Sequence, residues 1–318
     1  MLQFPSGRLL ARRALLALSA LAGACVALPG GAGAQGTPRG PKFDQALHDM
    51  LPASIKAAGV ISFGGLWETP PIIAVDLAKP GVPKGIAPDL AAGMGEVLGV
   101  RIQWLNMPWP AQLPGLQAGN VDVLFGQISD TAERERSVAD LIPFQRRGYG
   151  LLTAAGNPLK LAKLTDLCGV TIAVPIGSVN GAVLRNISAT QCVAAGKPAI
   201  VMREFNGATA MVQALRAGSV EATFDSAPNL ATTAASDPAA FGFVALPTDF
   251  LEPEYSAIAV SKENPQLTKA LAEALKKVIA DGTYAAAYKG VPGMSEAGLT
   301  PAQVIINPLT KTPVGTKP

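Results

Sequence analysis

A short segment that follows an apolar stretch combines residue types that bind anions. It runs from Gly126 to Arg134 and includes Ser129 and Thr131. Free backbone N–H groups at a helix start attract anions, both hydroxyls can donate hydrogen bonds, and the Arg134 guanidinium can fork onto a carboxylate. The alternative is a helix capped by Asp130 or Thr131, with Arg134 exposed among neighbouring charges. These residues alone leave both interpretations open.

Two more polar positions follow apolar stretches later in the chain. Ser178 comes after Gly177 in a small turn, and Asp225 ends a stretch that begins near Val220. A carboxylate at Asp225 can accept an ammonium group, so Arg134 and Asp225 together would suit a zwitterion. The alternative for Asp225 is a helix cap, because a helix can begin at the residues that follow it.

Aromatic residues accompany these polar groups. Trp67 stands beside Glu68, and Trp109 precedes a helical stretch. An aromatic wall beside a polar clamp is typical of a pocket for a small solute, although these tryptophans could equally pack in a core.

The elements that must position these residues alternate along the chain. Helical stretches rich in alanine separate the predicted strands, and such alternation predicts an α/β fold with largely parallel sheets. The predicted strands are Val60 to Phe63, Arg101 to Leu105, Val121 to Phe125, Val170 to Val174, Ile200 to Glu204 and Val220 to Phe224. A later helix is expected to start at Asn264 and Pro265.

One pattern occurs twice. Residues 116–126 match residues 215–225 in type, and each copy has a glycine, Gly119 or Gly218, where a helix would end and a buried strand begin. The repeat indicates two lobes that share one supersecondary unit. Ligands bind beyond the carboxyl ends of strands in open parallel sheets, so Ser129 and Asp225 are expected to face a common ligand.

The N-terminus predicts export. Arg8, Arg12 and Arg13 precede an apolar run, and Ala32-Gly33-Ala34 offers a cleavage site, so residues 1–34 are predicted to be a signal peptide rather than a lipoprotein signal. These three arginines are the only charged residues of that segment, and they account for the formal net charge of +3. The mature chain is therefore neutral. A neutral chain without a basic cluster argues against nucleic acid as a partner.

The cysteines and the histidine limit the chemistry. Cys168 and Cys192 remain after cleavage, and an even count in an oxidising compartment favours a disulfide over two free thiols. His48 is the sole histidine and lies far from both cysteines, so neither a metal site nor a cofactor is expected.

A set of short motifs, in the order in which they occur along the chain, resembles the family 3 extracellular solute-binding proteins of amino-acid ABC transporters. The motif residues are Leu51-Pro52, Ile55-Lys56, Gly59, Pro70-Pro71, Asp89-Leu90, Leu98-Gly99-Val100, Leu116, Gly119, Val121-Asp122, Thr131, Arg134, Asp166-Leu167, Gly169 and Asp281-Gly282-Thr283-Tyr284. The resemblance implies a two-lobed periplasmic-binding-protein fold, in which each lobe is a mostly parallel sheet flanked by helices and the chain crosses twice between lobes. The expected boundaries are a signal peptide at 1–34, a flexible leader at 35–50, lobe 1 at 51–149 and 251–307, lobe 2 at 150–250, and a flexible tail at 308–318.

The same resemblance implies roles for the candidate residues. Arg134 and the Ser129 region would hold an α-carboxylate, Ser178 would assist, Asp225 would take the α-amino group, and Trp109 would cover the solute. Trp67 or Glu68 would replace an aromatic residue that many members have where this chain has Thr69. Gln127 would add an amide contact. The residue set therefore leaves the side-chain specificity open.

The expected function is a monomeric periplasmic solute-binding component of an ABC importer, which captures a small amino acid or related carboxylate and docks on a permease. The rival is a periplasmic enzyme on the same scaffold, similar to the cyclohexadienyl dehydratases. An enzyme needs a positioned acid or base, and a serine or cysteine triad is disfavoured because His48 lies outside the core and both cysteines are expected to pair.

Overall fold

The computed structural model describes residues 42–247, 255–292 and 298–311, and it contains two five-stranded sheets. The first sheet has the order β5-β1-β6-β13-β7. Its strands are β1 (Val60–Gly65), β5 (Arg101–Asn106), β6 (Val123–Ser129), β7 (Asp140–Arg146) and β13 (Tyr255–Val260). A small sheet of β2 (Glu68–Thr69), β3 (Ile73–Val75) and β4 (Pro83–Lys84) follows β1.

The second sheet has the order β10-β9-β11-β8-β12. Its strands are β8 (Tyr149–Ala154), β9 (Thr171–Pro175), β10 (Val201–Phe205), β11 (Ala222–Ser226) and β12 (Phe241–Ala245). Each predicted strand exists, although β6 and β11 begin two residues later than expected. We refer to the parts built on the first and second sheets as lobe 1 and lobe 2.

Each sheet is mostly parallel, as the sequence predicted, because four of its five strands run in the same direction and one strand, β13 or β8, runs against them. In lobe 1, β5, β1 and β6 are parallel, whereas β13 runs antiparallel to both β6 and β7. In lobe 2, β8 runs antiparallel to both β11 and β12. The antiparallel strands flank the segments where the chain passes from one sheet to the other. Alternating βα units indicate parallel pairing but carry no signal for these crossing strands.

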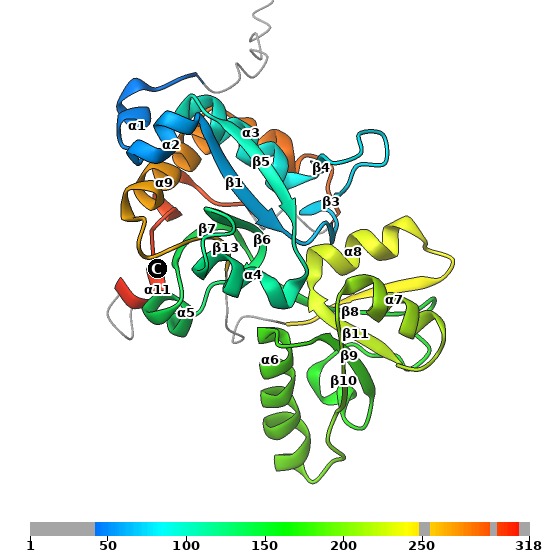
Figure 1. Cartoon of the computed structure of the whole chain (residues 1–318). Helices are drawn as coiled ribbons and strands as arrows, with labels where there is room; N and C mark the ends of the chain where they lie inside the picture. Colours follow the sequence, from blue (N-terminus) through cyan, green and yellow to red (C-terminus); the bar gives the residue numbers. More distant parts are fainter. Residues whose placement is uncertain (1–41, 248–254, 293–297, 312–318) are drawn as a thin grey trace, which may run out of the picture. The chain divides into compact units, whose positions relative to one another are not determined.

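Helices flank each sheet (Figure 1). The helices of lobe 1 are α1 (Gln45–Asp49), α2 (Ala53–Ala58), α3 (Ile86–Leu98), α4 (Trp109–Gln117), α5 (Ala132–Ser137), α9 (Pro265–Ala280), α10 (Thr283–Tyr288) and α11 (Pro308–Lys311). Those of lobe 2 are α6 (Val179–Ile187), α7 (Ala208–Arg216) and α8 (Ala227–Ser236). Short 3-10 or π turns span Leu164–Leu167, Ser188–Cys192, Val193–Ala195 and Pro301–Gln303. Asn264 and Pro265 begin α9 as predicted, and its apolar stripe lies in the core of lobe 1.

The two copies of the sequence repeat form the same local structure. Gly119 after α4 and Gly218 after α7 both have a left-handed backbone, with φ of 74° and 68°. Each glycine N–H donates to the carbonyl three residues earlier, on Leu116 or Leu215. The strand that follows is the third in its sheet, β6 or β11. The predicted helix-glycine-strand unit is therefore confirmed in both lobes.

Both chain ends depart from the expected leader and tail. Asp44 caps α1 through its side chain, and Leu47 of that helix is buried, so the predicted leader at 35–50 is wrong from residue 42 onward. His48, expected outside the fold core, accordingly contacts the Leu98 carbonyl oxygen through Nδ1 at 2.8 Å. Residues 1–41, with the predicted signal peptide, lie outside the described residues.

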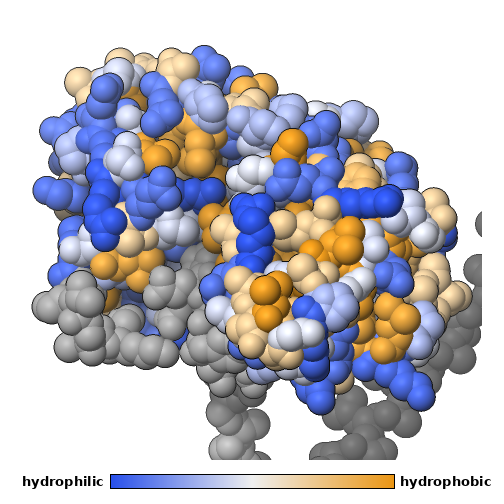
Figure 2. Space-filling model, turned by 90° about the horizontal axis from the view of Figure 1, so that it is seen from below, coloured by the Kyte–Doolittle hydropathy of each residue, from blue (hydrophilic) through white to orange (hydrophobic). Residues whose placement is uncertain are grey.

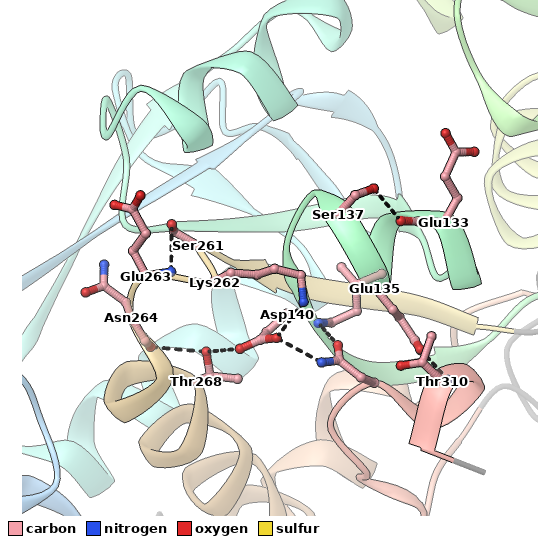
Figure 3. Close-up of polar contacts among 12 residues, drawn as sticks. Glu133, Glu135, Ser137, Asp140, Ser261, Lys262, Glu263, Asn264, Thr268 and Thr310 are labelled. Carbon is pink, nitrogen blue, oxygen red and sulfur yellow. Dashed lines mark hydrogen bonds and ion pairs between the residues drawn. The ribbon is translucent and has the colours of Figure 1, made fainter. Parts of the chain in front are cut away.

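The C-terminal segment docks on α5 and β7 (Figure 3). The Asn307 amide receives a hydrogen bond from the Leu141 N–H and donates one to Asp140, both at 2.8 Å. The Glu135 carboxylate accepts the backbone N–H groups of Leu309 and Thr310 at the start of α11. The predicted flexible tail is therefore wrong for residues 308–311. Sequence patterns missed this docking because it depends on contacts with residues more than 160 positions away.

The predicted disulfide joins Cys168 to Cys192 in lobe 2, where Cys192 is completely buried. Within the described residues, no helix is long and apolar enough to cross a membrane. Hydrophilic and hydrophobic residues are interspersed over the face in Figure 2.

Candidate functional site

A small cavity lies where polar side chains from both lobes converge. Its volume is about 40 Å³, measured as the space open to the centres of water molecules. One water needs roughly 10–15 Å³ in this measure, so the cavity holds only a few waters in this conformation. We call it the central cavity. Five predicted site residues line it, namely Trp109, Gln127, Ser129, Ser178 and Asp225.

Four other predicted residues lie outside the central cavity. Arg134 lines a neighbouring cavity of about 310 Å³, which we call the side cavity and which shares Trp109 with the central one. Thr131 caps α5 by accepting the Arg134 N–H at 3.2 Å. Trp67 is buried in the core of lobe 1. Glu68 accepts a hydrogen bond from Thr209 in lobe 2 at 2.9 Å, close to Gly207, which lines the central cavity.

Sequence reasoning missed Arg147, which lines the central cavity from the segment between β7 and β8. Its Nη1 donates to the Ser129 hydroxyl at 2.7 Å, and its Nη2 donates to the Asn180 amide oxygen at 3.0 Å. The guanidinium lies 5.3 Å from the centre of the Tyr149 ring, within cation–π range. Its Nε is buried without a hydrogen-bond partner. The sequence feature that could have identified Arg147 is its position beside Gly148, next to the expected boundary between lobe 1 and lobe 2 at residues 149 and 150.

Asn180 and Asn229 were also missed, and both come from helices that follow strand ends. Asn180 lies in the first turn of α6, and its amide connects Arg147 to Asp225 by donating to Asp225 Oδ1 at 2.6 Å. Asn229 lies in the first turn of α8 and accepts a hydrogen bond from Gln127 at 2.9 Å. A rule that includes the first helical turn after each strand would have found both.

Asp225 is the penultimate residue of β11 and is buried. Its Oδ1 also accepts the Ser226 N–H at 2.7 Å. Burial raises the pKa of this carboxyl above its usual value, and the hydrogen bond from the Ser226 N–H, the positive charge of Arg147 and the amides of Asn180 and Asn229 offset only part of that rise.

Arg134 lies between Ser129 and the side cavity. Its Nη1 donates to the Ser129 carbonyl at 2.9 Å. Burial and then the nearby Arg147 charge lower the pKa of Arg134 to about 10, so it remains a cation at neutral pH. Neighbouring Asp130 is completely buried, and burial followed by the effect of Glu135 raises its pKa to about 8. Asp130 therefore carries little charge at pH 7.

Polar contacts join the two lobes around the central cavity. Gln127 of β6 contacts Asn229 of α8, and Glu68 of β2 contacts Thr209 of α7. Arg147, in the crossing segment, contacts Ser129 of lobe 1 and Asn180 of lobe 2. The Gln127 Oε1 and Asn229 Nδ2 atoms are buried without partners, so they keep one acceptor and one donor beside the cavity. This set of groups is suited to hold a small polar solute, since a few convergent polar groups fix orientation in such pockets.

Two similar mixed sheets with a polar cavity between their strand ends define a two-lobed solute-binding protein. The sequence profile of the bacterial extracellular solute-binding proteins, family 3, matches residues 62–291, and the chain belongs to this family.

Individual relatives agree with this assignment. A probable histidine-binding protein of Neisseria gonorrhoeae is 25% identical over 206 residues, which are 64% of this chain and 73% of that protein. An ancestral arginine-binding protein, solved bound to glutamine, matches with a TM-score of 0.64 and 25% identity over 73% of this chain and 97% of that one. An ancestral amino-acid-binding protein described as a precursor of cyclohexadienyl dehydratase has the same fold, with a TM-score of 0.63 and 23% identity over 75% of this chain and 97% of that one.

Proposed function

We propose that this protein captures a small amino acid or related carboxylate for an ABC importer. The observation that carries the proposal is the central cavity, whose polar lining comes from β6 of lobe 1 and from β11, α6 and α8 of lobe 2. The family membership and the amino-acid-binding relatives support the same conclusion.

In this proposal the solute carboxylate binds the hydroxyl of Ser129 and the guanidinium of Arg147. Arg134 supports Ser129 from the side cavity, where it donates to the Ser129 carbonyl. The α-amino group pairs with Asp225, and Trp109 covers the solute. Gln127 and Ser178 contribute the remaining polar contacts. Thr131 acts indirectly by capping α5, while Trp67 and Glu68 shape lobe 1 around the cavity.

Solute capture is coupled to lobe closure. Solute binds first to one lobe and then contacts the other, so it favours the closed form through contacts that only this form offers. The contacts of Gln127 with Asn229 and of Glu68 with Thr209 add to that preference. The proposed hinges are the crossings between β7 and β8 and between β12 and β13. Residues 248–254 of the second crossing lie outside the described residues.

Export, docking and the lack of catalysis complete the proposal. The N-terminal segment is a cleaved signal peptide, the mature monomer works in the periplasm, and the closed form docks on a permease. Binding rather than catalysis is supported by the relatives named as a histidine-binding and an arginine-binding protein.

Titration calorimetry with amino acids and small carboxylates tests the proposal. Protein expressed from residue 35 should bind at least one of them with a 1:1 ratio. Asp225→Asn should weaken the binding of an amino acid at least tenfold but leave the binding of the analogue without the amino group unchanged. Asp237→Asn is a matched control, because Asp237 is an exposed lobe 2 carboxylate that pairs with Arg216. Absence of binding by every solute in the panel would refute the proposal.

The dehydratase alternative makes a different prediction about the same sample. A binding protein returns its solute unchanged, so the solute recovered after overnight incubation should have the same chromatographic retention and mass. Conversion of the solute by the protein, lost in Asp225→Asn, would favour the enzyme.

A further inference from the structure

The cavities contain more positive than negative charge. Arg147 lines the central cavity and Arg134 lines the side cavity, and both donate to Ser129, one to its hydroxyl and the other to its carbonyl. Among the described residues, the ion pairs within 4.0 Å include neither arginine. Two guanidiniums therefore converge on one serine without a direct carboxylate partner.

The carboxyl group that lines the cavities, Asp225, cancels only part of this charge. Asp225 contacts Arg147 only through the Asn180 amide. Asp130, beside Ser129, is mostly protonated at pH 7 because burial raises its pKa to about 8. The Glu135 carboxylate accepts the backbone N–H groups of Leu309 and Thr310 and lines neither cavity. The charged residues that line the two cavities are Arg134, Arg147 and Asp225, which together leave one positive charge.

Partly buried and unpaired guanidiniums are costly, and a carboxylate ligand offsets that cost through charge-assisted hydrogen bonds. The Arg147 Nε is buried and has no partner. A solute with its own guanidinium or ammonium side chain would instead place like charges together, which costs binding free energy.

We propose that the solute is a net-anionic small carboxylate, either an acidic amino acid or a dicarboxylate, and that Arg147 excludes basic amino acids. This inference rests on the proposed function and narrows it. It predicts a solute of a different charge from those named for the histidine-binding and arginine-binding relatives, and it rests on a guanidinium of this chain that lines the central cavity.

Calorimetry at pH 7.4 in low salt tests the inference with aspartate, glutamate, succinate, glutamine, histidine, lysine and arginine. The best anionic solute should bind at least 100-fold more tightly than any basic amino acid and at least tenfold more tightly than glutamine. Tighter binding of aspartate or glutamate than of succinate indicates that the solute is an acidic amino acid, and the reverse order indicates a dicarboxylate. Raising NaCl should weaken the anionic solute.

Variants of adjacent arginines test the role of Arg147. Arg147→Gln should weaken the binding of the anionic solute at least tenfold, and Arg147→Lys should retain part of the affinity that Arg147→Gln loses. Arg146→Gln is the matched control, since Arg146 lies over the Tyr255 ring and does not line the central cavity. Circular dichroism and the melting temperature without solute show whether each variant folds.

The outcomes separate this inference from the proposed function. A basic or neutral amino acid that binds as tightly as the anionic solutes overturns the inference and leaves the proposed function standing. An unchanged affinity of folded Arg147→Gln for the anionic solute also overturns it. Failure of every solute to bind overturns both.

Discussion

Reduction of the Cys168–Cys192 disulfide should destabilise lobe 2 by a calculable amount. The two cysteines are 24 positions apart, and closing such a loop removes conformational entropy from the unfolded chain equivalent to about 3.5 kcal/mol at 25 °C. At roughly 2–4 °C per kcal/mol, the melting temperature should fall by about 7–14 °C. Neither cysteine lines the central cavity, so solute affinity below the transition should stay the same.

Urea unfolding of the oxidised and reduced wild-type protein measures this difference. Reduction keeps both sulfur atoms in place, so the comparison isolates the cross-link from the packing of the completely buried Cys192. The variant with Cys168→Ala and Cys192→Ala is the control, because reductant should not change its stability. A reporter of lobe 2 structure, such as hydrogen exchange in β9 and β11, locates the effect.

Two results would refute this reasoning. A difference below about 1 kcal/mol between the oxidised and reduced proteins would mean that the unfolded chain is already restricted without the cross-link. An equal loss in the double alanine variant on adding reductant would mean that the reductant acts elsewhere.

Three further predictions concern stability. The folded state raises the Asp130 pKa from 3.8 to about 8, so its stabilising contribution is fully present below pH 3.8 and is lost as pH rises towards 8. Asp130→Asn should therefore flatten the wild-type decline in urea midpoint between pH 5 and 8, and parallel pH profiles would contradict this. Asn307→Gly keeps the positive φ of 53° accessible but removes the side-chain hydrogen bonds to Leu141 and Asp140. The free energy of unfolding in urea should fall by about 2–3 kcal/mol. A loss below about 0.5 kcal/mol would show that the C-terminal segment docks without these bonds. Gly119→Ala and Gly218→Ala should each lower the free energy of unfolding by about 1–2 kcal/mol through backbone strain alone, because φ is positive and no atom lies within 4 Å of the added carbon. Unequal losses would argue against equivalent helix-glycine-strand units in the two lobes.

The candidate site shows which residues local patterns can identify. Ser129, Ser178 and Asp225 lie at or just beyond strand ends, and the βα alternation places such positions at one edge of a sheet. All three line the central cavity. Arg147 does not follow a strand end in a βα unit, and its place depends on how the chain crosses between the sheets. Asn229 lies one turn further on, in the first turn of α8, which a rule limited to strand ends does not include.

Burial is the second property that sequence patterns did not predict. Arg134 reads as a clamp for a carboxylate, yet its Nη1 contacts the Ser129 carbonyl and its side chain lines the side cavity. Trp67 reads as a pocket wall but packs in the lobe 1 core. The choice between pocket and core depends on the packing of segments far apart in the chain, which a local window does not contain.

The sequence by itself determined the alternating strands, the two helix-glycine-strand joints, the disulfide pair and the resemblance to the solute-binding family. These features depend on local periodicity, on backbone freedom at glycine, and on residue type and order. Only the tertiary structure decided the antiparallel strands, the docked segment around Asn307 and the meeting of Arg147 with Ser129 and Asn180. These features arise from contacts between residues that are distant in sequence, and their geometry is set by the whole packed fold.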